Sequence, residues 1–73
     1  MPEKIKAGEL KQGDVIIADK WSSLWLRIVP TTCTVMDVTV FGSNVNIMAK
    51  AMDGMKEYIT EIFAARDTEF AAA

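Results

Sequence analysis

Residue types that carry enzymatic chemistry are few in this 73-residue chain, and none stands in a catalytic arrangement. The chain has no histidine, so its serines lack the general base that a nucleophilic hydroxyl needs. Its single cysteine, Cys33, lies among threonines without a basic neighbour, and we expect it to be a buried apolar residue. The acidic residues form neither an acid–base pair nor a cluster with metal-ligand spacing. The sequence therefore predicts a protein that is not an enzyme and that uses no metal or cofactor.

Two tryptophans and an arginine are the candidate binding residues. Residues 24–29 alternate in a way that predicts a strand, with Trp25 and Arg27 on its outer face. The core-facing residues of this strand would be Leu24, Leu26 and Ile28. Trp21 is expected in the exposed loop before it. Because Trp and Arg are enriched at interaction hot spots, Trp21, Trp25 and Arg27 are the predicted partner-binding site. Two alternatives remain open: Trp25 closes an open barrel end, or the two faces are reversed.

Basic residues in the first third of the chain raise a second hypothesis, the binding of nucleic acid. Lys4, Lys6 and Lys11 are followed by Lys20 and Trp21, and aromatic side chains among basic ones can stack on bases. Acidic residues are interleaved with them: Glu3, Glu9, Asp14 and Asp19. Eight basic against ten acidic residues give a net charge of −2, which disfavours binding through bulk charge. We therefore expect a protein partner and keep nucleic acid as the alternative.

The middle of the chain is predicted to be β-structure. The turn residues Gly13 and Asp14 precede a β-branched run at 15–18, and residues 33–41 are again rich in β-branched side chains. The residues expected on one face of this second strand are Met36, Val38 and Val40. Residues 42–44 would close it as a three-residue turn.

The last third of the sequence supports two interpretations. As a hairpin, Asp53 and Gly54 are the central residues of a type I′ turn, which pairs Lys50 with Glu57. As a helix, the segment would present an apolar stripe formed by Met48, Met52, Met55, Ile59, Ile62 and Phe63. That helix would hold Gly54 internally, at a cost of about 1 kcal/mol relative to alanine, and residues 55–66 are its most ambiguous part. We favour the hairpin, and we keep an α+β fold with a C-terminal helix as the alternative. The outer face of this hairpin would carry Met48 and Ile59, which suggests a third hypothesis, a self-assembling structural module.

Length and composition predict one small domain over residues 1–70. The chain is 51% hydrophobic and 25% charged, which is typical of a globular protein. Residues 71–73, three alanines, are expected as a tail, either native or added during cloning. No apolar run reaches membrane-spanning length and no signal peptide is visible, so we expect a cytoplasmic protein without a membrane partner.

The segment Leu10-Lys11-Gln12-Gly13-Asp14-Val15-Ile16 resembles the Leu-Lys-x-Gly-Asp-x-Ile opening of many small SH3-like barrels. Such domains often end in a hairpin around an Asp-Gly turn, which Asp53-Gly54 matches. The resemblance implies a small antiparallel SH3-like barrel of about five strands, in which closure removes exposed sheet edges. Folds of this kind carry many unrelated functions.

In size and general character the chain is also similar to short bacteriophage proteins that bind the RNA polymerase of a bacterial host. That likeness implies a transcription regulator that inhibits initiation, promotes antitermination, or does both. Its mechanism would be steric, because such a protein occupies a polymerase surface that an initiation factor or the nascent RNA needs. Trp21, Trp25 and Arg27 would then be the contact residues.

Overall fold

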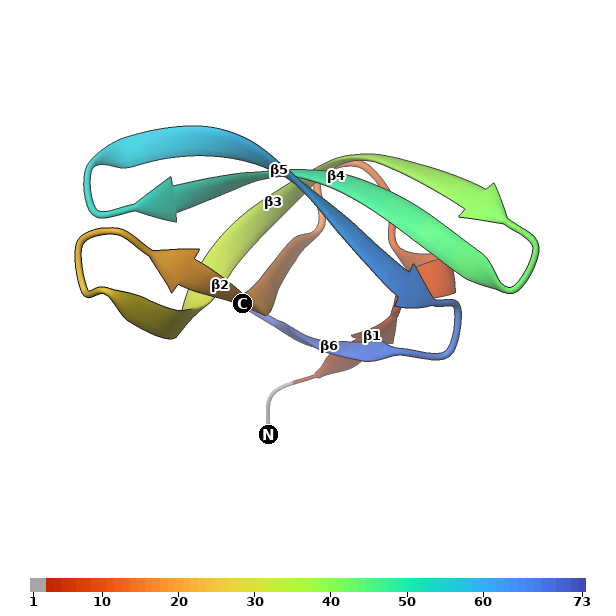
Figure 1. The fold of residues 1–73 in the computed structure, drawn as a ribbon. Helices are drawn as coiled ribbons and strands as arrows, with labels where there is room; N and C mark the ends of the chain where they lie inside the picture. Colours follow the sequence, from red (N-terminus) through yellow and green to blue (C-terminus); the bar gives the residue numbers. More distant parts are fainter. Residues whose placement is uncertain (1–2) are drawn as a thin grey trace.

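The computed structural model describes residues 3–73, which form six β-strands and one 3-10 helix. The strands make a single antiparallel sheet in the order β1-β6-β2-β3-β4-β5. The elements are β1 (Lys4–Lys6), η1 (Ala7–Glu9), β2 (Val15–Ser22), β3 (Arg27–Phe41), β4 (Asn44–Asp53), β5 (Lys56–Ala65) and β6 (Glu69–Ala72). The sheet curls over itself, so that β1 and β6 lie below the long hairpins of β3, β4 and β5 (Figure 1). The predicted all-β antiparallel class is confirmed.

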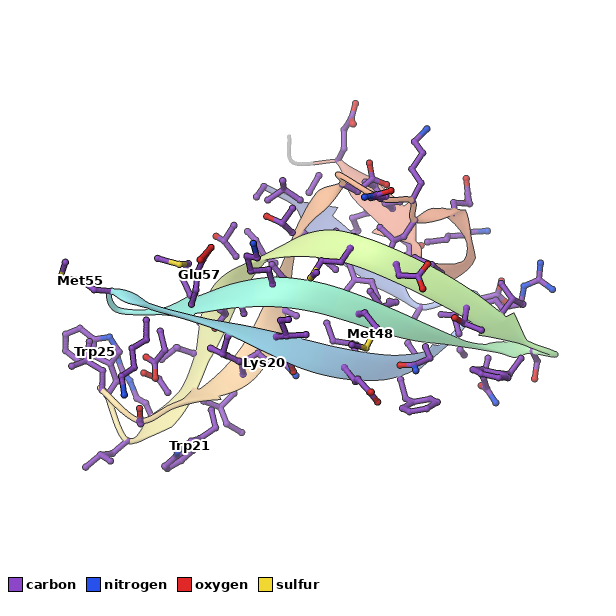
Figure 2. The ribbon with its side chains drawn as sticks, turned by 90° about the horizontal axis from the view of Figure 1, so that it is seen from above. Lys20, Trp21, Trp25, Met48, Met55 and Glu57 are labelled. Carbon is purple, nitrogen blue, oxygen red and sulfur yellow. The ribbon has the colours of Figure 1, made fainter. Side chains whose placement is uncertain are left out.

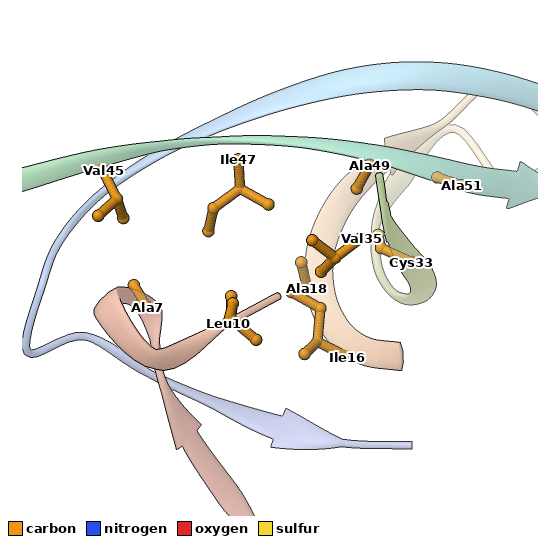
Figure 3. Packing of buried hydrophobic residues seen from close by; sticks show 10 residues of the cluster. All are labelled: Ala7, Leu10, Ile16, Ala18, Cys33, Val35, Val45, Ile47, Ala49 and Ala51. Atoms are coloured by element: carbon orange, nitrogen blue, oxygen red, sulfur yellow. The ribbon is translucent and has the colours of Figure 1, made fainter. Parts of the chain in front are cut away.

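Alternation along β4 builds the core. Every second residue from Val45 to Ala51 is fully buried, and the side chains between them face outward. These residues pack against β2, β3 and the segment around η1 (Figure 3). The other members of the cluster are Ala7, Leu10, Ile16, Ala18, Cys33 and Val35. Burial of each larger aliphatic side chain stabilises the fold by about 1.5–3 kcal/mol.

The hairpin interpretation of the last third is correct, and residues 56–65 are strand β5 rather than part of a helix. The turn lies one residue later than predicted, because Asp53 pairs with Lys56 around Gly54 and Met55. Gly54 has a φ of +65°, which suits the first central position of a type II′ turn. The later turn moves the pairing by two residues, so every side chain keeps its predicted face.

Two other turns and one strand differ from the prediction. Residues 23–26 form a loop, and β3 begins only at Arg27, so the core positions predicted for Leu24, Leu26 and Ile28 are wrong. Leu24 and Leu26 are exposed because the loop carries them past the end of the β2–β3 ladder, which closes at Ser22 and Arg27. Ile28 lies within the ladder opposite Trp21, and both side chains are exposed. The β3–β4 turn has two residues, since Phe41 pairs with Asn44.

A β-bulge at Met36 explains a further difference. Val35 pairs with Ala49 and Asp37 with Met48, so Met36 has no partner in β4. An extra residue in one strand reverses the direction of the side chains that follow it. Met36 is therefore exposed and does not share a face with Val38, contrary to the prediction.

The C-terminal residues lie within the sheet. Ala71 and Ala72, expected as part of a tail, belong to β6 between β1 and β2. Phe70 pairs with Ile5, and Ala72 pairs with Ile16. Within residues 3–73, no helix has the length and apolar character needed to cross a membrane.

Candidate protein-binding site

Two hairpins separate at one end of the molecule. The β3–β4 ladder ends at Cys33 and Ala51; beyond it, residues 27–32 pair only with β2 and residues 52–53 only with β5. The β2–β3 loop and the β4–β5 turn therefore project side by side at the same end (Figure 1). Each hairpin tip is free of the main sheet and available to hold side chains away from the core.

Asp53 joins the two hairpin tips. Its Oδ1 accepts a hydrogen bond of 2.6 Å from the Ser22 hydroxyl, and its Oδ2 accepts bonds of 2.9 and 2.8 Å from the N–H and hydroxyl of Ser23. The bonds from Ser22 and then Ser23 hold the pKa of the Asp53 carboxyl below its usual value. Ser22 Oγ in turn accepts the Trp25 N–H at 3.2 Å. The bridge fixes the loop that carries Trp25 against the β4–β5 turn.

Large apolar side chains gather on these two tips. Trp21 is 60% exposed, Trp25 63% and Met55 99%. Figure 2 shows these three residues at the end of the molecule where the hairpins project. We call the set the apolar tip, and its members are Trp21, Leu24, Trp25, Leu26, Ile28, Met52 and Met55, all exposed. Exposed apolar side chains gathered at one end of a protein are typical of interaction surfaces.

A cleft of about 210 Å³ opens where β3 and β4 separate. Trp21, Trp25 and Met52 line it, together with Thr31 and Tyr58. Burial raises the pKa of the Tyr58 hydroxyl, which stays protonated and can donate a hydrogen bond. The cleft thus combines two tryptophans with hydroxyl groups and the Asp53 carboxylate, and most of its accessible lining is polar.

Leu26 adds backbone strain to this surface. It has a φ of +54° and is the one non-glycine residue with positive φ in residues 3–73. Its N–H donates to the Ser22 carbonyl at 2.8 Å, which closes the loop and holds this conformation. A left-handed leucine costs about 1–2 kcal/mol relative to the ordinary conformation. Strain together with an exposed apolar side chain is typical of functional surfaces.

The structure places the predicted binding residues as follows. Trp21 lies on β2 instead of in a loop, and Trp25 lies in a loop instead of on a strand. Both tryptophans are nevertheless exposed and line the same cleft. Arg27 is exposed at the start of β3 and does not line the cleft.

Several members of the apolar tip were missed by the sequence reasoning. Leu24 and Leu26 had been assigned to the core, and Met52 and Met55 had been given no role. Met55 follows the Asp-Gly turn signal directly, so a turn placed one residue later would have shown it as an exposed methionine at a hairpin tip. The two leucines gave no such signal, because they alternate with Trp25 and Arg27 in the pattern that is typical of a strand.

The remaining candidate chemistry is buried or dispersed. Cys33 is fully buried as predicted, and burial raises the pKa of its thiol, while the nearby Lys20 ammonium acts in the opposite direction. Residues 3–73 contain no group of three or more His, Cys, Asp or Glu side chains that could hold a metal ion. Met48 and Ile59 lie on the outer face of the β4–β5 hairpin; Met48 is half-buried and Ile59 is exposed.

Comparisons of the chain with protein-family models, with curated protein sequences and with solved structures find no match.

Proposed function

We propose that this protein acts by binding another protein through the apolar tip. The observation that carries the proposal is the exposure of seven large apolar side chains on two hairpin tips that the Asp53 hydrogen bonds hold together. A pre-organised surface loses little conformational freedom on binding, so more of its apolar contact contributes to affinity. The strained conformation of Leu26 supports the same interpretation, because strained residues cluster at functional sites.

For the partner we propose the RNA polymerase of a bacterial host, with the protein acting as a phage-type transcription regulator. The support is the similarity in size and general character to short phage proteins of this class. The apolar tip would occupy a polymerase surface needed by an initiation factor or by the nascent RNA. Inhibition of initiation, antitermination, or both would follow from steric exclusion.

The proposal is tested with the full chain and purified bacterial RNA polymerase, as core enzyme and as holoenzyme. We expect direct binding, reduced initiation from a promoter template, and an affinity that changes little between about 50 and 200 mM salt, as apolar contacts predict. Trp21→Ala and Trp25→Ala should each weaken binding, while Phe41→Ala, at an exposed aromatic residue next to the β3–β4 turn, serves as the matched control. Absence of binding to either form of the polymerase would refute the proposed partner.

The same experiment separates the nucleic-acid alternative. Binding that disappears after nuclease treatment, or that weakens steeply with salt, would indicate contacts to phosphates. Tryptophans of the apolar tip would then act as stacking platforms for bases. Binding that survives nuclease assigns the interface to protein.

A further inference from the structure

Strand β5 forms a long free edge of the sheet. It pairs with β4 alone, and in residues 3–73 no backbone group outside that ladder hydrogen-bonds to residues 57–64. Figure 2, viewed from above, shows β5 as the outermost strand beyond β4. The opposite edge, β1, has only three residues. Natural sheets protect their edges with short strands, proline, bulges or charged side chains. Residues 57–65 of β5 contain no proline, and their only charged side chains are Glu57 and Glu61.

The backbone groups that point to this edge follow from the turn. Asp53 and Lys56 flank a two-residue turn and so form a hydrogen-bonded pair, after which bonded and non-bonded pairs alternate along an antiparallel ladder. Even-numbered residues of β5 therefore bond to β4. The N–H and C=O groups left for another strand belong to Glu57, Ile59, Glu61 and Phe63.

The side chains of those four residues alternate between acidic and apolar. All four are exposed on the outer face of the sheet. Glu57 lies 3.8 Å from Lys50, whereas Glu61 stands opposite Met48 and has no ion pair within the described chain. A strand added to this edge would therefore place its alternate side chains beside carboxylate, apolar, carboxylate and apolar groups in turn.

A second copy of β5 does not complement this pattern. In an antiparallel self-pair that sets Ile59 opposite its own copy, Glu57 faces Glu61 of the other copy twice. In the register shifted by two residues, Glu61 faces Ile59 and Glu57 faces Phe63, and in the register shifted by four residues Glu61 faces itself. Like charges directly opposite each other destabilise a strand pair. None of these registers places a basic side chain beside Glu57 or Glu61, so the two carboxylates favour a strand of opposite charge over a second copy.

We propose that the β5 edge binds an extended segment of a partner protein in which basic and apolar side chains alternate, by antiparallel strand addition. Main-chain hydrogen bonds supply affinity, and the two glutamates select the basic segment. This inference is independent of the apolar tip, since β5 contributes none of the residues of that set. It gives the protein a second interaction surface.

Two synthetic peptides test the inference, with sequences TVTKTVTKT and TVTETVTET. Titrated into the ¹⁵N-labelled protein, the lysine peptide should shift the amide signals of residues 57–63 and slow their hydrogen exchange, and the glutamate peptide should have little effect. Glu61→Lys should weaken the lysine peptide by about fivefold and strengthen the glutamate peptide. Glu69→Lys makes the same change in net charge at an exposed residue of β6 and should leave both affinities unchanged.

Four results would overturn the inference. The first is the absence of any shift along β5 at millimolar lysine peptide. The second is equal binding of the two peptides, because the carboxylates would then select nothing. The third is an equal effect of Glu61→Lys and Glu69→Lys, which would reveal a response to net charge alone. The fourth is a free protein that sediments as a dimer and whose monomer–dimer equilibrium is shifted by Glu61→Lys, because the edge would then bind a second copy.

Discussion

Replacement of Trp25 by alanine gives a quantitative test of the apolar tip. The side chain is 63% exposed; for a tryptophan of about 250 Å² this leaves roughly 160 Å² available to a partner. At about 25 cal/mol per Å², complete burial of that area would contribute about 4 kcal/mol. Incomplete burial and the ordering of the interface reduce this to about half. We therefore expect Trp25→Ala to weaken polymerase binding by about 2 kcal/mol, or about thirtyfold in Kd.

The assay is surface plasmon resonance on immobilised polymerase, with urea unfolding of each variant measured in parallel. Because Trp25 is mostly exposed, its replacement should change the free energy of unfolding by less than about 1 kcal/mol. Phe41→Ala removes an aromatic side chain that is 56% exposed and should leave Kd within about twofold of wild type. Wild-type affinity in a folded Trp25→Ala protein would refute the reasoning, and so would unfolding of that variant, which would assign Trp25 to the core.

The structure supports four further predictions. Leu26→Gly should raise the unfolding free energy by about 0.5–1 kcal/mol, because glycine tolerates the φ of +54°, while polymerase binding weakens; thermal denaturation and plasmon resonance measure the two effects. Asp53→Asn should destabilise the protein near neutral pH in urea titrations. Since the folded pKa of Asp53 is lowered, its stabilisation is complete above the unfolded value of about 3.9 and disappears as the pH falls through the folded value, so the two proteins should converge in acid. Ile47→Ala should cost about 2–5 kcal/mol in the same titrations, because the side chain is fully buried. Cys33 should react with a thiol reagent slowly in the native protein and rapidly in urea, because burial raises its pKa and blocks access.

Alternation and turn residues were sufficient to predict the fold class. The β4–β5 hairpin was found because Asp53-Gly54 marks a turn and because Val45, Ile47, Ala49 and Ala51 alternate with polar or flexible side chains. The register was wrong by two residues, since Asp-Gly is compatible with two turn positions and only the packed structure selects one. The bulge at Met36 was invisible because it is defined by a partner strand and not by its own sequence.

The candidate site was predicted in part, for a reason that lies in the loop itself. Trp21 and Trp25 were recognised by residue type, and both are exposed and line one cleft. Their neighbours Leu24 and Leu26 have the spacing of core-facing strand residues, but they lie in the loop beyond the end of the β2–β3 ladder. The bridge from Asp53 to Ser22 joins residues 31 positions apart, and no local pattern reports such a contact.

The position of β6 between β1 and β2 has a consequence for biosynthesis. Lys4 pairs with Ala71, so the first strand has no partner until 67 further residues have been translated. At about 5–20 residues per second, this takes several seconds, and the ribosome tunnel delays it further. During that interval the β2–β5 meander can form while one side of β2 stays unpaired. The partly synthesised protein is therefore expected to be most prone to degradation and aggregation until β6 has emerged and paired, and removal of residues 69–73 would make that vulnerable state permanent.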